Sequence, residues 1–299
     1  MPFQIGGIFL ADKHIYNFTN EIEEVEVSSL GAKITVLSTE DSTITAEYQN
    51  PLDKPEFCAV LCGKKLTLKE KCTFNFFRSK AEGEYSITVR LPKTMYKKIK
   101  INTASGGVEL PDAAVNAEHF ELNTASGEIN INSAFVHAAI KSASGNVNVI
   151  GVEGLSPAEL KISTVSGTVN VRNYSAEKYS ISSVSGKTSY SGATGEGNIT
   201  VTSGNVEITY AEWNKDLKIN AVSGNVNIIL PDDSGADVQF DGVSGTVKTN
   251  LNNTDGGFMN LGRGTNGEFG GSNKHKVNIN LVSGKVTLAK NGSFETVKE

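Results

Sequence analysis

Nine Ser-Gly pairs recur along the chain inside a short frame of alternating apolar residues, and they are its first candidates for chemistry. The pairs are Ser105-Gly106, Ser126-Gly127, Ser144-Gly145, Ser166-Gly167, Ser185-Gly186, Ser203-Gly204, Ser223-Gly224, Ser244-Gly245 and Ser283-Gly284. A serine beside a glycine can be a nucleophile or part of an anion-binding loop, but such elements occur once per site and lead into a helix. A serine nucleophile also needs an adjacent base, and none recurs here. We therefore interpret the pairs as structural.

Cysteines and histidines form no convincing metal site in the sequence. Cys58, Cys62 and Cys72 have a loose spacing and no neighbouring histidine. A structural zinc ion takes four ligands, so we expect free thiols. The four histidines are His14, His119, His137 and His275. They show no metal-ligand spacing, and we expect them not to repeat with the Ser-Gly period. The sequence thus predicts neither a metal nor another cofactor.

A glycine-rich segment, residues 251–276, contains a short match to a nucleotide-binding motif. Gly262, Gly264 and Gly267 fit the dinucleotide pattern GxGxxG. That motif works between a strand and the N-terminus of a helix, and no helical periodicity follows it here. We predict no nucleotide site. We expect 251–276 to be a surface loop, and one of the better places to look for a specific ligand.

Residues expected to face outward form two columns, one on each side of the serines. Four positions after the serines stand Glu109, Asn130, Asn148, Asn170, Ser189, Glu207, Asn227, Lys248 and Thr287. Three positions before them stand Asn102, Asn123, Lys141, Ser163, Ser182, Thr200, Asn220, Asp241 and Asn280. Glycoside hydrolysis needs two carboxylates, and neither column has a carboxylate pair in adjacent repeats. We predict that the protein is not an enzyme.

The residues around each pair indicate the element that carries it. Apolar or small residues lie two, four and six positions before the serine and three and five after it, as Leu160, Ile162 and Val169 do around Ser166. Period-two alternation indicates a strand with one buried face. The step of three across Ser-Gly indicates a corner, where glycine accepts a positive φ. We expect the serine to face inward and hydrogen-bond a backbone group.

The distance between pairs predicts how the elements assemble. Successive serines are 18 to 22 residues apart, apart from a last gap of 39. A period near twenty is typical of a solenoid, whose repeats bury their apolar faces by stacking. We predict an all-β fold, a right-handed parallel β-helix of roughly 20-residue coils. An antiparallel sandwich is the alternative, disfavoured because no Asn-Gly or Asp-Gly turn joins the paired strands.

The pattern divides the chain into three parts. Residues 1–98 lack the pairs, and we interpret them as a degenerate N-terminal β cap continuous with the stack. Residues 99–290 are the regular Ser-Gly β-helix, with the 251–276 loop inserted and the last coil, Val277 to Leu288, closing the stack. Residues 291–299 are a polar tail. The aromatic patch Phe74, Phe76 and Phe77 is expected to cover the core end rather than to bind a ligand.

Charge and hydropathy limit the partners of the chain. The formal net charge is −5, with acids and bases spread along the whole length, so no basic stripe supports a nucleic-acid partner. No apolar stretch approaches the roughly eighteen residues of a membrane-spanning helix. Residues 1–12 lack the basic leader and the cleavage site of a signal peptide. As written, the chain is expected to stay in the cytoplasm.

Several motifs together resemble a bacterial family. They are the stretch Leu-Pro-x-x-x-x-x-x-Ile-x-Ile-x-Thr-Ala-Ser-Gly from Leu91, the Ser-Gly corners, and the last coil, Val-x-Ile-x-Leu-Val-Ser-Gly-Lys-Val-x-Leu from Val277. These features are similar to the "putative adhesin" family, a group of domains of unknown function. The resemblance is strongest from Leu91 to Leu288. It implies a β-helix and adhesion at the cell surface or envelope, and it supplies no catalytic residues.

Three functions remain open from the sequence. The leading one is a non-enzymatic bacterial β-helical scaffold, an adhesin that binds a surface glycan or a protein. The second is an intracellular or envelope-associated structural protein that self-assembles into oligomers through its solenoid ends. The third is a carbohydrate-active enzyme, which acidic pairs converging in a groove would support.

Overall fold

The computed structural model describes residues 8–10, 13–19, 21–50, 57–70, 85–133, 135–152, 154–155, 157–252 and 257–290. The regular elements in these ranges are β-strands, so the all-β prediction is confirmed. Nowhere in these ranges is there a helix long and apolar enough to cross a membrane. The chain divides into two compact units, Met1–Val152 and Glu153–Glu299, and each is described separately below. The patch Phe74, Phe76 and Phe77 and the 291–299 tail lie outside the described residues.

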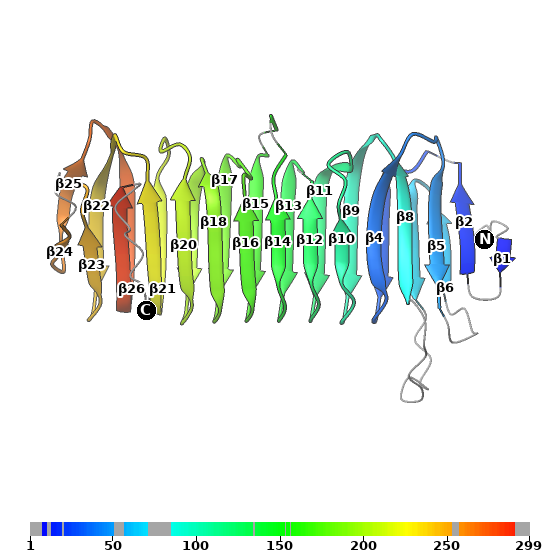
Figure 1. Ribbon diagram of the computed structural model, residues 1–299, viewed down its shortest axis with the longest axis horizontal. Coiled ribbons are helices and arrows are strands. Elements are labelled where there is room, and N and C mark those ends of the chain that lie inside the picture. Colours follow the sequence, from blue (N-terminus) through cyan, green and yellow to red (C-terminus); the bar gives the residue numbers. More distant parts are fainter. Residues whose placement is uncertain are drawn as a thin grey trace. The chain divides into compact units, whose positions relative to one another are not determined.

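Unit 1 contains two ladders of paired strands (Figure 1). The first ladder has the order β6 (Phe57–Cys62), β7 (Lys65–Glu70), β3 (Glu24–Ser29), β9 (Met95–Thr103), β11 (Asn116–Thr124) and β13 (His137–Ser142). The second has the order β1 (Ile8–Leu10), β2 (Lys13–Phe18), β5 (Ile44–Gln49), β8 (Ser86–Pro92), β4 (Lys33–Thr39), β10 (Val108–Leu110), β12 (Ile129–Asn132) and β14 (Val147–Ile150).

The strand pairs of unit 1 are of two kinds. From β7 to β13 in the first ladder, and from β8 to β14 in the second, neighbours are parallel. The pairs β6–β7, β1–β2, β2–β5 and β5–β8 are antiparallel. Antiparallel strands therefore end the parallel ladders of this unit, at β6 in the first ladder and at β5, β2 and β1 in the second.

The core of unit 1 follows from the alternation of apolar residues. Ile87, Ile34, Val108, Ile129 and Val147 are register partners on five successive strands of the second ladder, and none has measurable exposure. Burial of each such side chain contributes about 1.5–3 kcal/mol. Because every coil supplies the same inward positions, the buried column runs across the strands.

Unit 2 also contains two ladders (Figure 1). The first has the order β15 (Glu159–Thr164), β17 (Lys178–Ser183), β19 (Glu196–Val201), the first half of β21 (Leu217–Leu230), the first half of β26 (Asn273–Lys290), β22 (Ser234–Gly242) and β25 (Asn266–Gly270). The second has the order β16 (Thr168–Arg172), β18 (Lys187–Ala193), β20 (Asn205–Tyr210), the second half of β21, the second half of β26, β23 (Thr246–Thr249) and β24 (Met259–Leu261).

The last coil lies inside unit 2 and does not close the stack as predicted. β26 pairs in parallel with β21 on one side and with β22 and β23 on the other. The predicted loop over 251–276 instead contains β24 and β25, which are antiparallel to β23 and β22. Glycine-rich composition suggested a loop because glycine is depleted in strands. Here Gly270, at φ +83°, turns the chain, and the Gly271 N–H donates to the Ser234 carbonyl at 3.0 Å.

Glycines at the Ser-Gly pairs are required for two reasons, of which the sequence indicated one. Five of the nine have a positive φ, namely Gly127, Gly145, Gly167, Gly186 and Gly284. The second reason is the closeness of the next coil. A Cβ on Gly145 would lie 2.3 Å from the carbonyl oxygen of Gly127, and a Cβ on Gly224 would lie 2.4 Å from that of Gly204. At Gly224, where φ is not positive, this contact alone excludes a side chain.

The serines of the pairs do not face inward as predicted. Ser144 and its equivalents are half-buried or exposed. The Ser144 hydroxyl donates to the carbonyl of Ala125 in the neighbouring coil at 3.2 Å. The inward hydroxyl belongs to the residue two positions earlier, as in Thr124, which donates to the Ser126 carbonyl at 2.8 Å. The chain turns between these two residues, so the strand alternation does not reach the serine.

Candidate binding groove

The residue immediately before each serine forms an exposed apolar row in unit 2. In spatial order the row is Val165, Val184, Thr202, Val222, Val282 and Val243. Its valines are between 46% and 62% exposed. Adjacent coils bring these side chains about 4.8 Å apart, so they form a continuous edge, which we call the valine ridge.

A groove of about 490 Å³ lies beside the part of the ridge that contains Thr202, Val222, Val282 and Val243. The buried residues next to the ridge, Val201, Ala221 and Leu281, form its floor together with Gly242. These four residues are register partners on β19, β21, β26 and β22. These floor residues alternate with two rows of outward side chains, and the groove lies between those rows. Ligand pockets in proteins measure roughly 300–1,000 Å³.

The wall opposite the ridge is polar. It consists of Thr200, Asn220, Asn280 and Asp241, which are also register partners. The Asn280 side-chain amide donates to the Asn220 side-chain oxygen at 2.9 Å. An amide has two N–H donors and an oxygen with two lone pairs, and this bond engages one donor of Asn280 and one lone pair of Asn220.

A second hollow of about 240 Å³ continues from the polar wall. It shares Asp241 and Asn280 with the groove and adds Lys218, Gln239, Asn278 and Ile279. Its lining therefore contains one carboxylate and one ammonium group among amides. Together the groove and this hollow present an apolar strip beside a polar strip that carries one carboxylate and one ammonium group.

The sequence contained a signal for the groove that the predictions did not use. The outward residue before the serine is valine at five pairs of unit 2 and alanine at Ala104, Ala125 and Ala143 of unit 1. In unit 1 and at the first two coils of unit 2, the floor position is a threonine or serine whose hydroxyl bonds the corner, as Thr164 does with the Ser166 carbonyl at 3.0 Å. From Val201 onward the floor position is apolar or glycine, and the groove begins there.

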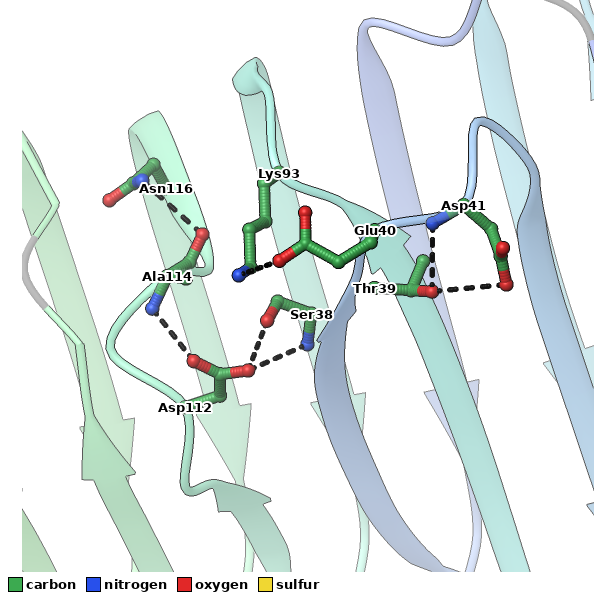
Figure 2. A network of polar contacts seen from close by, with 8 residues as sticks. All are labelled: Ser38, Thr39, Glu40, Asp41, Lys93, Asp112, Ala114 and Asn116. Atoms are coloured by element: carbon green, nitrogen blue, oxygen red, sulfur yellow. Dashed lines mark hydrogen bonds and ion pairs between the residues drawn. The ribbon is translucent and has the colours of Figure 1, made fainter.

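Polar residues of unit 1 gather where the chain leaves β10 (Figure 2). The Asp112 carboxylate accepts hydrogen bonds from the hydroxyl and N–H of Ser38 and from the N–H of Ala114. These bonds hold the pKa of Asp112 below its ordinary value, the Ser38 hydroxyl having the largest effect. Lys93 and Glu40 form an exposed ion pair beside them. With all of its partners in the protein, Asp112 ties the segment after β10 to β4, and we assign it a structural role.

The predicted free thiols are seen at two of three positions. Cys58 is half-buried and Cys62 is exposed, and both are free, whereas Cys72 lies outside the described residues. No group of three or more metal-binding side chains occurs in the part of the chain that the structure describes.

Two histidines repeat with the coil, contrary to the sequence reading. His119 and His137 are register partners on β11 and β13, and their rings stack with centroids 5.0 Å apart. Their separation of 18 residues equals one coil, which the sequence already contained. His14 lies on β2, and His275 packs edge-on against Trp213 at 5.9 Å.

The GxGxxG match has no nucleotide-binding context. The motif begins at Gly262, directly after β24, and its last glycine, Gly267, lies in β25, so the motif leads into a strand where a helix would be required. The Gly264 N–H donates to the Phe240 carbonyl at 3.0 Å, which fixes this turn to β22.

Buried aromatic residues fill the interior of unit 2 and are not part of the groove. The hydroxyl groups of Tyr179 and Tyr210 share a hydrogen bond, and Tyr210 packs edge-on against Trp213 at 4.8 Å. Burial raises the pKa of both tyrosines above the ordinary value. The Trp213 indole N–H donates to the Gly235 carbonyl at 2.7 Å, so this cluster ties β20 to β22.

Sequence comparison decides the family. The family model Toastrack DUF4097 matches residues 22–289. The chain belongs to the Toastrack family. This is a family of domains of unknown function, so membership brings a fold to this Toastrack protein and no activity. Among proteins with curated descriptions, none matches the chain.

Three solved structures that are similar to the chain are named as adhesins or as a lipid binding protein. A putative adhesin from Parabacteroides distasonis ATCC 8503 is 14% identical with a TM-score of 0.51, covering 94% of this chain and 97% of its own. A putative adhesin from Parabacteroides merdae ATCC 43184 is 13% identical with a TM-score of 0.37, covering 93% and 96%. A putative lipid binding protein from Parabacteroides distasonis ATCC 8503 is 10% identical with a TM-score of 0.39, covering 93% and 96%. At 14% identity, the similarity to the first of these structures shows the fold alone.

Proposed function

We propose that this Toastrack protein is a non-enzymatic bacterial binding scaffold, an adhesin that holds its ligand in the groove of unit 2. The observation that carries the proposal is the valine ridge beside an apolar floor. A contiguous row of exposed apolar side chains rimmed by polar residues is typical of interaction sites. The proposal includes a right-handed winding of the coils, the hand that parallel crossovers nearly always take.

The position of the groove on a regular stack supports this role. Its lining side chains come from strands whose backbone hydrogen bonds are already made to neighbouring strands. A ligand would therefore meet a surface that is fixed before binding, and less conformational entropy would be lost on association.

Two alternatives receive less support from the same residues. A glycosidase needs two carboxylates, and Asp241 is the single carboxylate among the residues that line the groove. Self-assembly that continues the parallel coils from one protein to the next needs parallel strands at the ends of the ladders. Antiparallel strands follow the parallel ones at β6 and β2 in unit 1 and at β24 and β25 in unit 2.

Localisation and adhesion together test the proposal. Fractionation and protease treatment of intact cells should find the protein at the surface, and deletion of its gene should reduce attachment of the cells to glycan-coated or matrix-protein-coated plates. Complementation with Val222→Asp/Val282→Asp should fail to restore attachment, whereas the matched ridge variant Val165→Asp/Val184→Asp should restore it. A protein that is wholly protected inside intact cells, or equal behaviour of the two variants, would contradict the proposal.

A further inference from the structure

The groove has a direction that limits the shape of its occupant. It crosses four neighbouring strands, β19, β21, β26 and β22. Three steps of about 4.8 Å separate the first strand from the last, about 14 Å in all. An occupant that uses the full groove is therefore an extended chain that runs across the strands and meets the same kind of wall residue at each step.

The two walls require an occupant with two different sides. On the ridge side it meets the side chains of Val222, Val282 and Val243, which are exposed to water without a ligand. On the other side it meets the amides of Asn220 and Asn280. A pyranose ring has this character, because its C–H groups form apolar faces while its hydroxyl groups, at the ring edge, donate and accept hydrogen bonds. Asparagine offers both functions in return.

Charge favours a neutral polymer. The combined lining of the groove and the second hollow contains Asp241 and Lys218 as its ionisable side chains. Polyanions such as nucleic acids or uronic-acid polymers are bound by clusters of lysine and arginine, and a single ammonium beside a carboxylate provides no such cluster.

Two other extended occupants fit less well. An acyl chain would cover the amides of Asn220 and Asn280 without giving them hydrogen bonds, which is unfavourable. An extended peptide repeats its side-chain direction every two residues, roughly 6.6–6.8 Å, whereas the wall repeats every 4.8 Å or so. A sugar residue in an extended glycan advances the chain by roughly one coil spacing.

We propose that the groove binds a neutral, extended glycan, with its sugar rings against the valine ridge and its hydroxyl groups bonded to Asn220 and Asn280. This inference rests on the proposed binding function and names its ligand class. Successive rings would occupy successive coils, so affinity should rise with chain length until the four strands are covered.

Affinity electrophoresis of the full chain tests the assignment. The probes are hydroxyethyl cellulose, galactomannan and dextran as neutral glycans, polygalacturonate as an acidic one, and phosphatidylethanolamine/phosphatidylglycerol vesicles in a parallel flotation assay. At least one neutral glycan should retard the wild-type protein. Asn280→Ala should weaken that interaction about three- to tenfold, the effect of losing one or more hydrogen bonds, and Val222→Asp should weaken it more than tenfold.

Matched controls separate the groove from the rest of the surface. Asn123→Ala removes an equivalent ladder amide of unit 1, which bonds Asn102 at 3.0 Å, and Val165→Asp changes a ridge valine that does not line the groove. Both should retain wild-type retardation within twofold. Retardation by no neutral glycan, stronger binding to polygalacturonate or vesicles, or equal losses in the control variants would each overturn the glycan assignment. In those cases the binding function itself is still decided by the attachment assay with the two double variants.

Discussion

The side-chain amide of Asn280 donates a 2.9 Å hydrogen bond to the side chain of Asn220, sixty residues earlier in the chain. The two residues are register partners because β26, the last strand among the described residues, lies between β21 and β22. Asn280, Leu281 and Val282 from this strand form the middle of the groove. The proposed binding surface is therefore completed only when the C-terminal strand has paired on both sides.

A truncation tests this dependence. A chain ending at Ser272 lacks β26, so β21 loses one neighbour and both β22 and β23 lose their parallel partner. We expect residues from β22 onward to become accessible to hydrogen exchange and protease within the dead time of the experiment, while unit 1 stays protected. A chain ending at Lys290 retains β26 and should behave as the full chain. Continued protection of β22 in the shorter chain would show that β26 is dispensable.

Substitution of a corner glycine should destabilise unit 1. In Gly145→Ala, the new Cβ meets the Gly127 carbonyl at 2.3 Å and the residue is held at φ +118°. Strain of this kind costs about 1–3 kcal/mol for the backbone alone, and the contact adds to it. The control is Gly262→Ala, where nothing lies within 4 Å of the added Cβ and φ is not positive. Denaturant unfolding measures both variants, and equal stabilities would refute the close-packing explanation.

The regular part of the fold could be predicted from the sequence because its causes are local. Alternation around Ile162 predicted its strand and its buried face, and the repeat period predicted that each coil stacks on another. The positions of β26 and β3 could not be predicted in this way. Each coil has apolar residues at the same inward positions, so the pattern alone does not show which strands are neighbours. Ile219, Ile279 and Phe240, for example, are register partners on three strands. Only the pairing of whole strands decides their order.

Loss of charge at Asp112 should weaken unit 1 in a pH-dependent manner. The hydrogen bonds from Ser38 and Ala114 hold the pKa of Asp112 below its ordinary value of 3.8. Because the pKa of this carboxyl is lower in the fold than in the unfolded chain, the carboxylate stabilises the fold at pH values above its ordinary pKa. This stabilisation is lost as the pH falls through the folded-state pKa. Asp112→Asn should therefore lower the unfolding free energy by about 1–2 kcal/mol at neutral pH, with the difference shrinking below about pH 4.

Urea unfolding of both proteins across this pH range measures the difference. Asp41→Asn serves as the control, because the Asp41 side chain is exposed and contacts only the neighbouring Thr39 hydroxyl among the hydrogen bonds described. A constant difference between wild type and Asp112→Asn from neutral pH to pH 2 or so would mean that the charge of Asp112 does not contribute.

The buried tyrosines predict alkaline unfolding of unit 2. Burial raises the pKa of Tyr179 and Tyr210 above 10 in the fold, whereas the unfolded chain ionises near the ordinary value. Stability is therefore fully present below pH 10 or so and falls as pH rises above it. Tyrosinate absorbance and circular dichroism should show ionisation of these residues together with loss of structure. Ionisation of both residues with unchanged circular dichroism would contradict this expectation.

Removal of one hydroxyl of the pair tests the hydrogen bond directly. Tyr179→Phe leaves the buried Tyr210 hydroxyl without this partner, which should lower the unfolding free energy by about 1–3 kcal/mol at neutral pH. The double variant Tyr179→Phe/Tyr210→Phe should recover part of the loss, because no unpaired hydroxyl remains. A double variant less stable than the sum of the single variants would rule out this explanation.

The candidate groove was only partly readable from the sequence. The sequence correctly placed Asn220, Asp241 and Asn280 in one outward column. It did not predict their order in space, in which Asn280 lies between the other two. The ridge was visible as valine before the serine at Val222 and Val282. Whether the ridge borders a groove depends on the floor residues. The sequence alone does not show whether a neighbouring side chain fills the space beside an inward alanine or glycine.

Hydroxyl-radical footprinting of the native protein tests the central claim most directly. The protein is labelled alone and with the polysaccharide and protein fractions of the bacterial envelope, and oxidation is read at each ridge valine by mass spectrometry. Binding in the groove predicts that Val222, Val282 and Val243 lose labelling with one fraction while Val165 and Val184 keep it. Unchanged labelling of all five with every fraction, or protection confined to Val165 and Val184, would contradict the groove as the binding surface.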